Sequence, residues 1–108
     1  MKKYPPWGDY HADLIELLKD PERASGYLNA SLEAGDREAF LMALRNVLEA
    51  QGGITKIAKA AKLNRVSLYK MLGVKGNPGF DNVLKLLHTV GIRFTVTPTK
   101  KKSRPKAA

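Results

Sequence analysis

Signals that start and stop α-helices recur at short intervals along this sequence, and they limit the chain to a set of short helices. Asp20 followed by Pro21 is typical of a helix start, because the Asp side chain can accept from free N–H groups and Pro lacks one. Asp36 and Asn64 are further candidate N-caps, and Gly35 stands where a helix would end. The pattern predicts five or six helices, over 9–19, 21–34, 37–51, 54–61, 65–72 and 80–90.

Apolar residues between these signals recur at helical spacing, which gives each predicted helix one buried face. With 108 residues, 44% of them apolar, the chain has enough apolar surface for one core. We expect this core to be built from Leu14, Ile15, Leu17, Leu18, Ala24, Tyr27, Leu28, Ser31, Leu32, Phe40, Leu44, Val47, Leu48, Ile57, Ala58, Ala61, Leu68, Met71, Leu72, Phe80, Val83, Leu84, Leu87 and Val90.

After the last helix the apolar period changes from helical to alternating. Ile92, Phe94 and Val96 alternate with polar residues until Pro98, a pattern that predicts a short C-terminal β-strand. The fold class is therefore mostly α with one strand. Residues 1–8 are interpreted as an irregular lead-in, 9–98 as the domain, and 99–108 as a disordered basic tail, solvated or acting as a DNA-binding arm.

The charge is divided unequally along the chain, which has a net charge of +9. Residues 1–50 carry 6 Lys/Arg and 9 Asp/Glu, a net charge of −3. Residues 51–108 carry 13 Lys/Arg and the single acid Asp81, a net charge of +12. This asymmetry predicts two surfaces with different partners, the basic one suited to a polyanion.

Several classes of protein are disfavoured by what the sequence lacks. There is no Cys, and the two His residues, His11 and His88, are 77 positions apart, so we expect no disulfide, metal site, cofactor or enzymatic activity. No run of about 18 apolar residues and no signal-peptide pattern is present, so we expect a cytoplasmic protein without a membrane partner.

The predicted helices 54–61 and 65–72 have the length and separation of a helix-turn-helix. On a helical wheel Leu68 points inward, whereas Val66 and Lys70 point away from it. Such helix pairs also occur in proteins that do not bind DNA, but the one-sided charge favours DNA.

Lys62 stands where DNA-binding versions often place Gly, at a position that tends towards positive φ. Tyr69 is interpreted as a surface packing residue. The candidate DNA-binding residues are Arg65, Val66, Ser67, Lys70, Lys56, Lys59, Lys62, Lys75 and Asn77.

Several motifs together resemble a known family. They are Asp20-Pro-Glu, Tyr27-Leu-Asn-Ala-Ser-Leu-Glu-Ala-Gly-Asp36, Glu38-Ala-Phe-Leu-Met-Ala-Leu-Arg45, Gln51-Gly-Gly, Leu63-Asn-Arg-Val-Ser-Leu-Tyr-Lys70, Gly76-Asn-Pro and Gly91-Ile-Arg-Phe. The chain resembles the HigA-like probable addiction-module antidote family, small relatives of the phage repressor/Cro helix-turn-helix class.

The resemblance implies a repressor-like helix-turn-helix domain that acts as an antitoxin in a type II toxin–antitoxin module. Such a protein binds a RelE/ParE-like toxin and represses the shared operon through double-stranded operator DNA. The acidic half would suit a basic toxin. A stand-alone phage-type repressor is the main alternative, and a toxin-like neighbouring gene would distinguish the two. An RNA-binding module is less favoured, because the chain lacks a strand platform with stacked aromatic residues.

We also predict a homodimer. A lone strand leaves backbone groups unpaired, so residues Ile92, Phe94 and Val96 are expected to pair with the same segment of a second copy. The two-fold axis would present two recognition helices to successive major grooves, about 34 Å apart.

Overall fold

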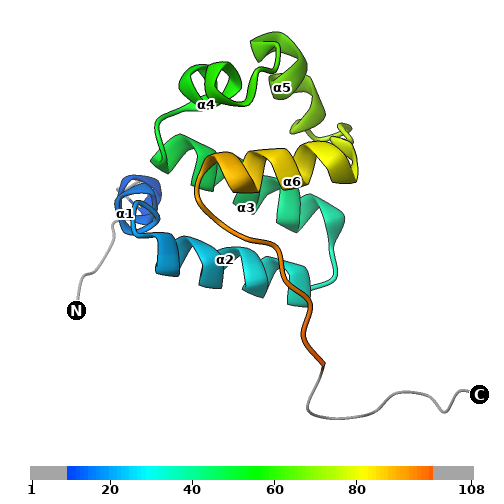
Figure 1. The fold of residues 1–108 in the computed structure, drawn as a ribbon. Helices are drawn as coiled ribbons and strands as arrows, with labels where there is room; N and C mark the ends of the chain where they lie inside the picture. Colours follow the sequence, from blue (N-terminus) through cyan, green and yellow to red (C-terminus); the bar gives the residue numbers. More distant parts are fainter. Residues whose placement is uncertain (1–9, 99–108) are drawn as a thin grey trace, which may run out of the picture.

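The computed structural model describes residues 10–98, and within this range it contains six α-helices and no β-strand (Figure 1). The predicted lead-in 1–8 and basic tail 99–108 lie outside the described residues. The helices are α1 (Tyr10–Leu17), α2 (Pro21–Glu33), α3 (Arg37–Ala50), α4 (Ile54–Ala61), α5 (Arg65–Met71) and α6 (Gly79–Thr89).

The helices form two regions around one core. In Figure 1, α2 lies along the bottom, α3 and α6 cross the middle, and α4 and α5 form the top, with α1 beside the start of α2. Helix α3 contacts α1, α2 and α4, so it connects the lower and upper regions. The fully buried large side chains come from both regions and are Leu18, Leu44, Val47, Leu48, Leu68, Leu72 and Leu86. A single hydrophobic core therefore fixes α4 and α5 on the remainder of the domain.

The predicted N-caps are confirmed. The Asp20 and Asp36 side chains accept hydrogen bonds from the backbone N–H groups of Glu22 and Glu38, at 3.4 and 3.1 Å. These bonds satisfy N–H groups that have no partner within the helix. The third predicted cap, Asn64, accepts from the N–H of Ser67 at 2.9 Å.

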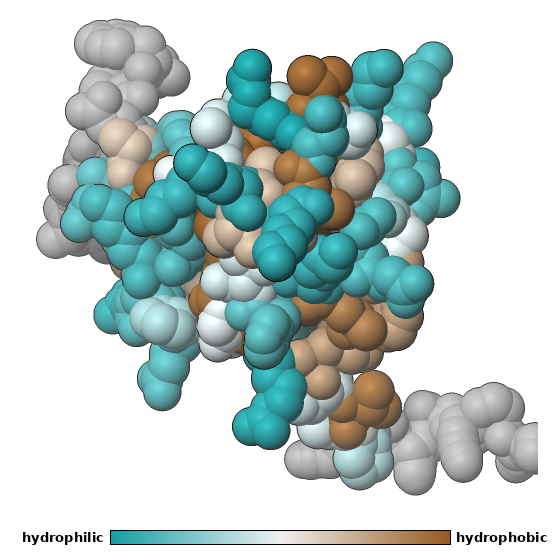
Figure 2. Space-filling view, turned by 45° about the horizontal axis from the view of Figure 1, so that its top comes forward, coloured by the Kyte–Doolittle hydropathy of each residue, from teal (hydrophilic) through white to brown (hydrophobic). Residues whose placement is uncertain are grey.

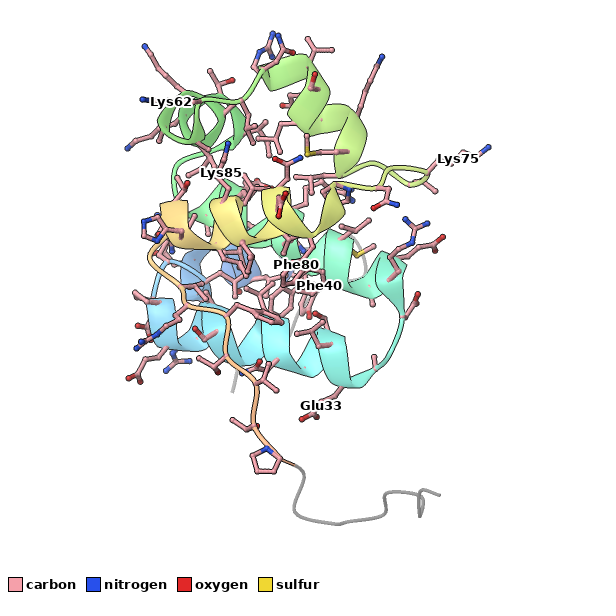
Figure 3. All side chains as sticks on the ribbon, turned by 45° about the vertical axis from the view of Figure 1, so that its right-hand side comes forward. Glu33, Phe40, Lys62, Lys75, Phe80 and Lys85 are labelled. Atoms are coloured by element: carbon pink, nitrogen blue, oxygen red, sulfur yellow. The ribbon has the colours of Figure 1, made fainter. Side chains whose placement is uncertain are left out.

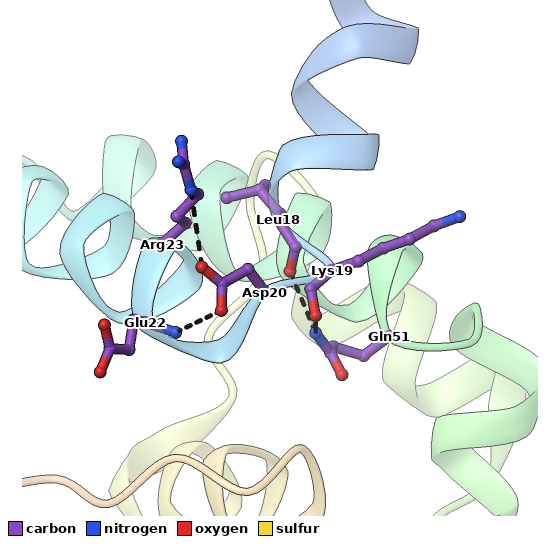
Figure 4. Close-up of polar contacts among 6 residues, drawn as sticks. All are labelled: Leu18, Lys19, Asp20, Glu22, Arg23 and Gln51. Carbon is purple, nitrogen blue, oxygen red and sulfur yellow. Dashed lines mark hydrogen bonds and ion pairs between the residues drawn. The ribbon is translucent and has the colours of Figure 1, made fainter.

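A glutamine joins the junction of α1 and α2 to the end of α3. Gln51 Nε2 donates to the carbonyl oxygens of Leu18 and Lys19, at 3.0 and 3.2 Å (Figure 4). Asp20, next along the chain, caps α2 and contacts Arg23 Nε at 3.5 Å. The loop between the two helices is thus held by side-chain contacts as well as by the buried Leu18.

The predicted C-terminal strand is wrong. Residues 92–98 form an extended segment, without strand pairing, that crosses α2 in Figure 1. Ile92 is half-buried against the core, whereas Phe94 is 40% and Val96 84% exposed. A strand requires a neighbour to share its backbone hydrogen bonds, and no other described segment supplies one. The alternation of apolar residues does not specify what lies beside the segment.

Three apolar side chains expected in the core are exposed instead. Phe80 is 60% exposed, and Leu17 and Leu32 are also exposed. Each lies at or near an end of its helix, where the neighbouring helices no longer cover it. The inward face of α6 is centred on Leu86 and Leu87, both buried, and Leu86 was absent from the expected core. Phe80 packs instead edge-on against Phe94, with ring centroids 5.6 Å apart.

Every helix between residues 10 and 98 is too short or too polar to span a lipid bilayer.

Candidate nucleic-acid interface

The two short helices predicted at 54–61 and 65–72 are present as α4 and α5, joined by Lys62, Leu63 and Asn64. Their contact is apolar and small: Ala58 is 2% exposed and Leu68 is fully buried. A larger side chain than alanine at position 58 would separate the two helices. The sequence therefore specified this helix pair correctly, including the residues that hold it together.

Lys62 adopts the left-handed conformation that its position requires, with φ 60° and ψ 44°. It is the one non-glycine residue with positive φ in the described range. The N–H groups of Leu63 and Lys62 bond to the carbonyl oxygens of Ala58 and Lys59, at 2.8 and 3.1 Å, which is a Schellman motif. Helix α6 ends in the same way, with Gly91 in the left-handed position. The expected positive φ at Lys62 is confirmed. A lysine occupies the left-handed position after α4 that a glycine, Gly91, occupies after α6.

The outward face of α5 carries Val66 and Lys70, as the helical wheel predicted, and Arg65 and Ser67 lie in the first turn of the same helix. Arg65, Val66, Ser67 and Lys70 are all exposed, Val66 to 56% although it is apolar. The Asn64 cap and the buried Leu68 fix the orientation of the helix, so these four side chains share one surface. We call this surface, with the lysines described next, the basic face.

Four further exposed lysines come from α4 and from the two loops that flank α5. Lys56, Lys59, Lys62 and Lys75 are exposed, and no Asp or Glu occurs between residues 51 and 80. The ion pairs found among residues 10–98 join other residues, in the α1–α3 region. Figure 2 shows hydrophilic side chains gathered over the α4–α5 end of the molecule, with a few hydrophobic ones among them. Lys62 and Lys75 lie at the opposite end from Glu33 (Figure 3).

Asn77, the last candidate, is exposed in the loop between α5 and α6. Its Oδ1 accepts a hydrogen bond of 3.2 Å from the N–H of Gly79, at the start of α6. The oxygen is therefore engaged in the turn, and the amide nitrogen is the part of the side chain available to a ligand.

Two arginines of the acidic half, residues 1–50, donate hydrogen bonds to the segment that follows α5. Arg45 Nη1 donates to the carbonyl oxygen of Leu72, at 2.7 Å, and Arg37 Nη1 to that of Gly76, at 2.6 Å. Both carbonyls follow α5, in the segment that carries Lys75. The sequence holds no signal for these bonds, because the partners are 27 and 39 residues apart and no repeat links them.

The structure also has a groove beside α2. A groove of about 250 Å³ lies between α2 and the extended segment, with Leu28, Phe40 and Leu87 among its apolar lining residues and Arg93 among its polar ones. Glu33, Asp36 and Glu38 are exposed in and beside the α2–α3 turn. Among residues 10–98, no group of three or more His, Asp or Glu side chains is arranged to hold a metal ion.

Comparison with known proteins identifies the family. A family model described as "Probable addiction module antidote protein" matches residues 10–98. An uncharacterized protein of Haemophilus influenzae is 33% identical over 88 residues, which are 82% of this chain and 90% of that protein. No solved structure matches the chain. The chain therefore belongs to the family of probable addiction module antidote proteins.

Proposed function

We propose that this antidote is a DNA-binding antitoxin that neutralises a RelE/ParE-like toxin and represses its own operon in the cytoplasm. The observation that carries the DNA-binding part is the basic face: α5 presents exposed polar and apolar side chains, surrounded by lysines with no carboxylate between residues 51 and 80. Family membership supports the antidote part, because an antidote has a toxin partner.

The helix pair would bind DNA as a helix-turn-helix, with α5 in the major groove. Arg65 could bond guanine through two hydrogen bonds, Val66 could contact a thymine methyl group, and Ser67 and Lys70 could bond bases or phosphates. The surrounding Lys56, Lys59, Lys62 and Lys75 would contact phosphates, which position the protein without reading sequence.

We assign the toxin to the acidic half of the chain, at the α2–α3 turn. The cations of residues 10–50 are already engaged: Lys19 pairs with Glu16, Arg23 with Asp20, and Arg37 and Arg45 bond to backbone carbonyls. Glu33, Asp36 and Glu38 have no ion pair among the described residues. They would attract a basic toxin.

The homodimer remains a prediction, but it no longer depends on a strand. Ile92, Phe94 and Val96 stay its proposed interface, because Phe94 and Val96 expose apolar surface and Phe94 contacts Phe80, which is also exposed. Two copies related by a two-fold axis would present two α5 helices to one face of DNA.

Two measurements test the function. The first is a gel shift of the full chain on DNA upstream of its own gene, across a salt series. Binding should weaken steeply with salt, because phosphate contacts release counterions. The second is co-expression with the product of the adjacent gene. A complex and restored growth support the antitoxin, whereas DNA binding without either result favours a stand-alone repressor.

A further inference from the structure

Tyr69 lies one helical turn after Arg65 on α5, and its ring is the neighbour of the Arg65 guanidinium. The Arg65 Cζ atom is 6.0 Å from the centroid of the ring. Arg65 has no ion pair among the described residues, so no carboxylate competes for the guanidinium. A cation near an aromatic face is attracted by the negative charge of the ring face.

The ring itself is available for this role because it is not used in the core. Tyr69 is 52% exposed, whereas Leu68, the preceding residue on the same helix, is fully buried. Tyr69 also lines an open groove with His11, Asn46, Glu49 and Ile54, so part of the side chain faces open space and not the core.

We propose that Tyr69 is a positioning residue that holds Arg65 ready to bond a base, and that it thereby sets sequence discrimination at that base pair. The inference rests on the proposed DNA binding. A free arginine side chain samples many rotamers and loses this freedom when it forms a two-bond contact. A ring that restricts the guanidinium before binding reduces that loss. The smaller loss of conformational entropy strengthens binding to the correct base, since only that base forms both hydrogen bonds with Arg65.

The matched pair of variants is Tyr69→Phe and Tyr69→Leu. Phenylalanine keeps the aromatic face without the hydroxyl group, and leucine keeps an apolar side chain without the aromatic face. We would first select the preferred site from random DNA with the full parent chain. The preference is then the ratio of Kd values for a site altered at one base pair and for the selected site.

We expect Tyr69→Phe to keep the parent preference at the base pair read by Arg65, and Tyr69→Leu to lower it about two- to fivefold. In an Arg65→Ala background the effect of Tyr69→Leu should vanish. The proposal is overturned if Tyr69→Leu retains the preference, or if it has the same effect without Arg65. A uniform loss in Tyr69→Phe on all sequences would instead show that the hydroxyl group contacts phosphate.

A measurement without DNA separates this inference from the proposed function. In the free protein, the ring current of Tyr69 should shift the NMR resonances of the Arg65 side chain, and Tyr69→Leu but not Tyr69→Phe should abolish the shift. If the chain binds no DNA, the proposed function fails while the shift still reports the contact. If the shift is absent in the parent protein, the positioning role is wrong whatever the chain binds.

Discussion

The guanidinium of Arg37, at the start of α3, donates a hydrogen bond of 2.6 Å to the carbonyl oxygen of Gly76, in the loop after α5. This bond joins the acidic half of the chain to the loop that carries Lys75. Gly76 lies so close to the carbonyl groups of Lys70 and Met71 that a Cβ atom would not fit there. The loop is therefore fixed from two sides, by close backbone packing and by an arginine from a distant helix.

Replacing Arg37 with alanine should lower the free energy of unfolding by about 1 kcal/mol, because a charged hydrogen bond to a carbonyl group is lost at an exposed site. Urea unfolding measures the change. Arg23→Ala is the matched control: it removes an equal charge whose recorded contact is the exposed pair with Asp20, and it should change stability by less. Equal effects of the two variants would mean that the bond to Gly76 contributes nothing beyond a surface ion pair.

Replacing Lys62 with glycine should raise the free energy of unfolding by about 1 kcal/mol, because glycine adopts the left-handed conformation without the steric cost that lysine bears. The same variant should bind DNA more weakly on every sequence and reduce the salt dependence, since one phosphate contact is lost. Lys62→Ala provides the control, because it removes the same charge but keeps the strain. If Lys62→Gly is no more stable than Lys62→Ala, the strain at this position is negligible.

Replacing Asn64 with alanine should destabilise the protein by about 1 kcal/mol, because the N–H of Ser67 loses its capping oxygen. Asn64→Asp keeps the cap and should retain the stability. It places a carboxylate at the start of α5, however, and should therefore weaken DNA binding. Thermal unfolding and gel shifts of both variants separate the two roles, and undiminished DNA affinity in Asn64→Asp would argue against α5 as the DNA-contacting helix.

Arg65→Ala and Lys56→Ala should weaken DNA binding in different ways. Loss of Arg65 should cost about 1–3 kcal/mol on the preferred site and relax the preference at one base pair. Loss of Lys56 should weaken all sequences alike, as expected for a phosphate contact. Titrations on the preferred and scrambled DNA measure both. An Arg65→Ala protein that binds the preferred site as tightly as the parent would contradict the assignment of α5 as recognition helix.

Replacing Phe94 with aspartate should convert the proposed homodimer to a monomer and reduce operator affinity, while helical content persists. Phe94 is 40% exposed and contacts Phe80, so the charge would enter the proposed apolar interface and not the core. Met42→Asp, at another exposed apolar residue, is the control and should leave the dimer intact. Sedimentation measures the state of each protein; a parent chain that is monomeric at tens of micromolar excludes this dimer.

The sequence by itself determined the helices and their ends. Asp20, Asp36 and Asn64 cap as predicted, and Lys62 has the left-handed conformation expected of its position. These features are local, because each depends on hydrogen bonds between residues a few positions apart. The inward side of α5 could be derived for the same reason, since helical geometry alone relates Leu68 to Val66 and Lys70.

Only the tertiary structure decided what lies beside each element. The alternation from Ile92 to Val96 looks the same whether the segment pairs with a strand or crosses a helix, and here it crosses α2. Phe80 continues the apolar stripe of α6 but lies beyond the helices that cover Leu86. The bonds of Arg37 and Arg45 join residues that are distant in sequence. Burial and long-range hydrogen bonds depend on how the helices pack together, and an apolar period records only which side of an element faces inward.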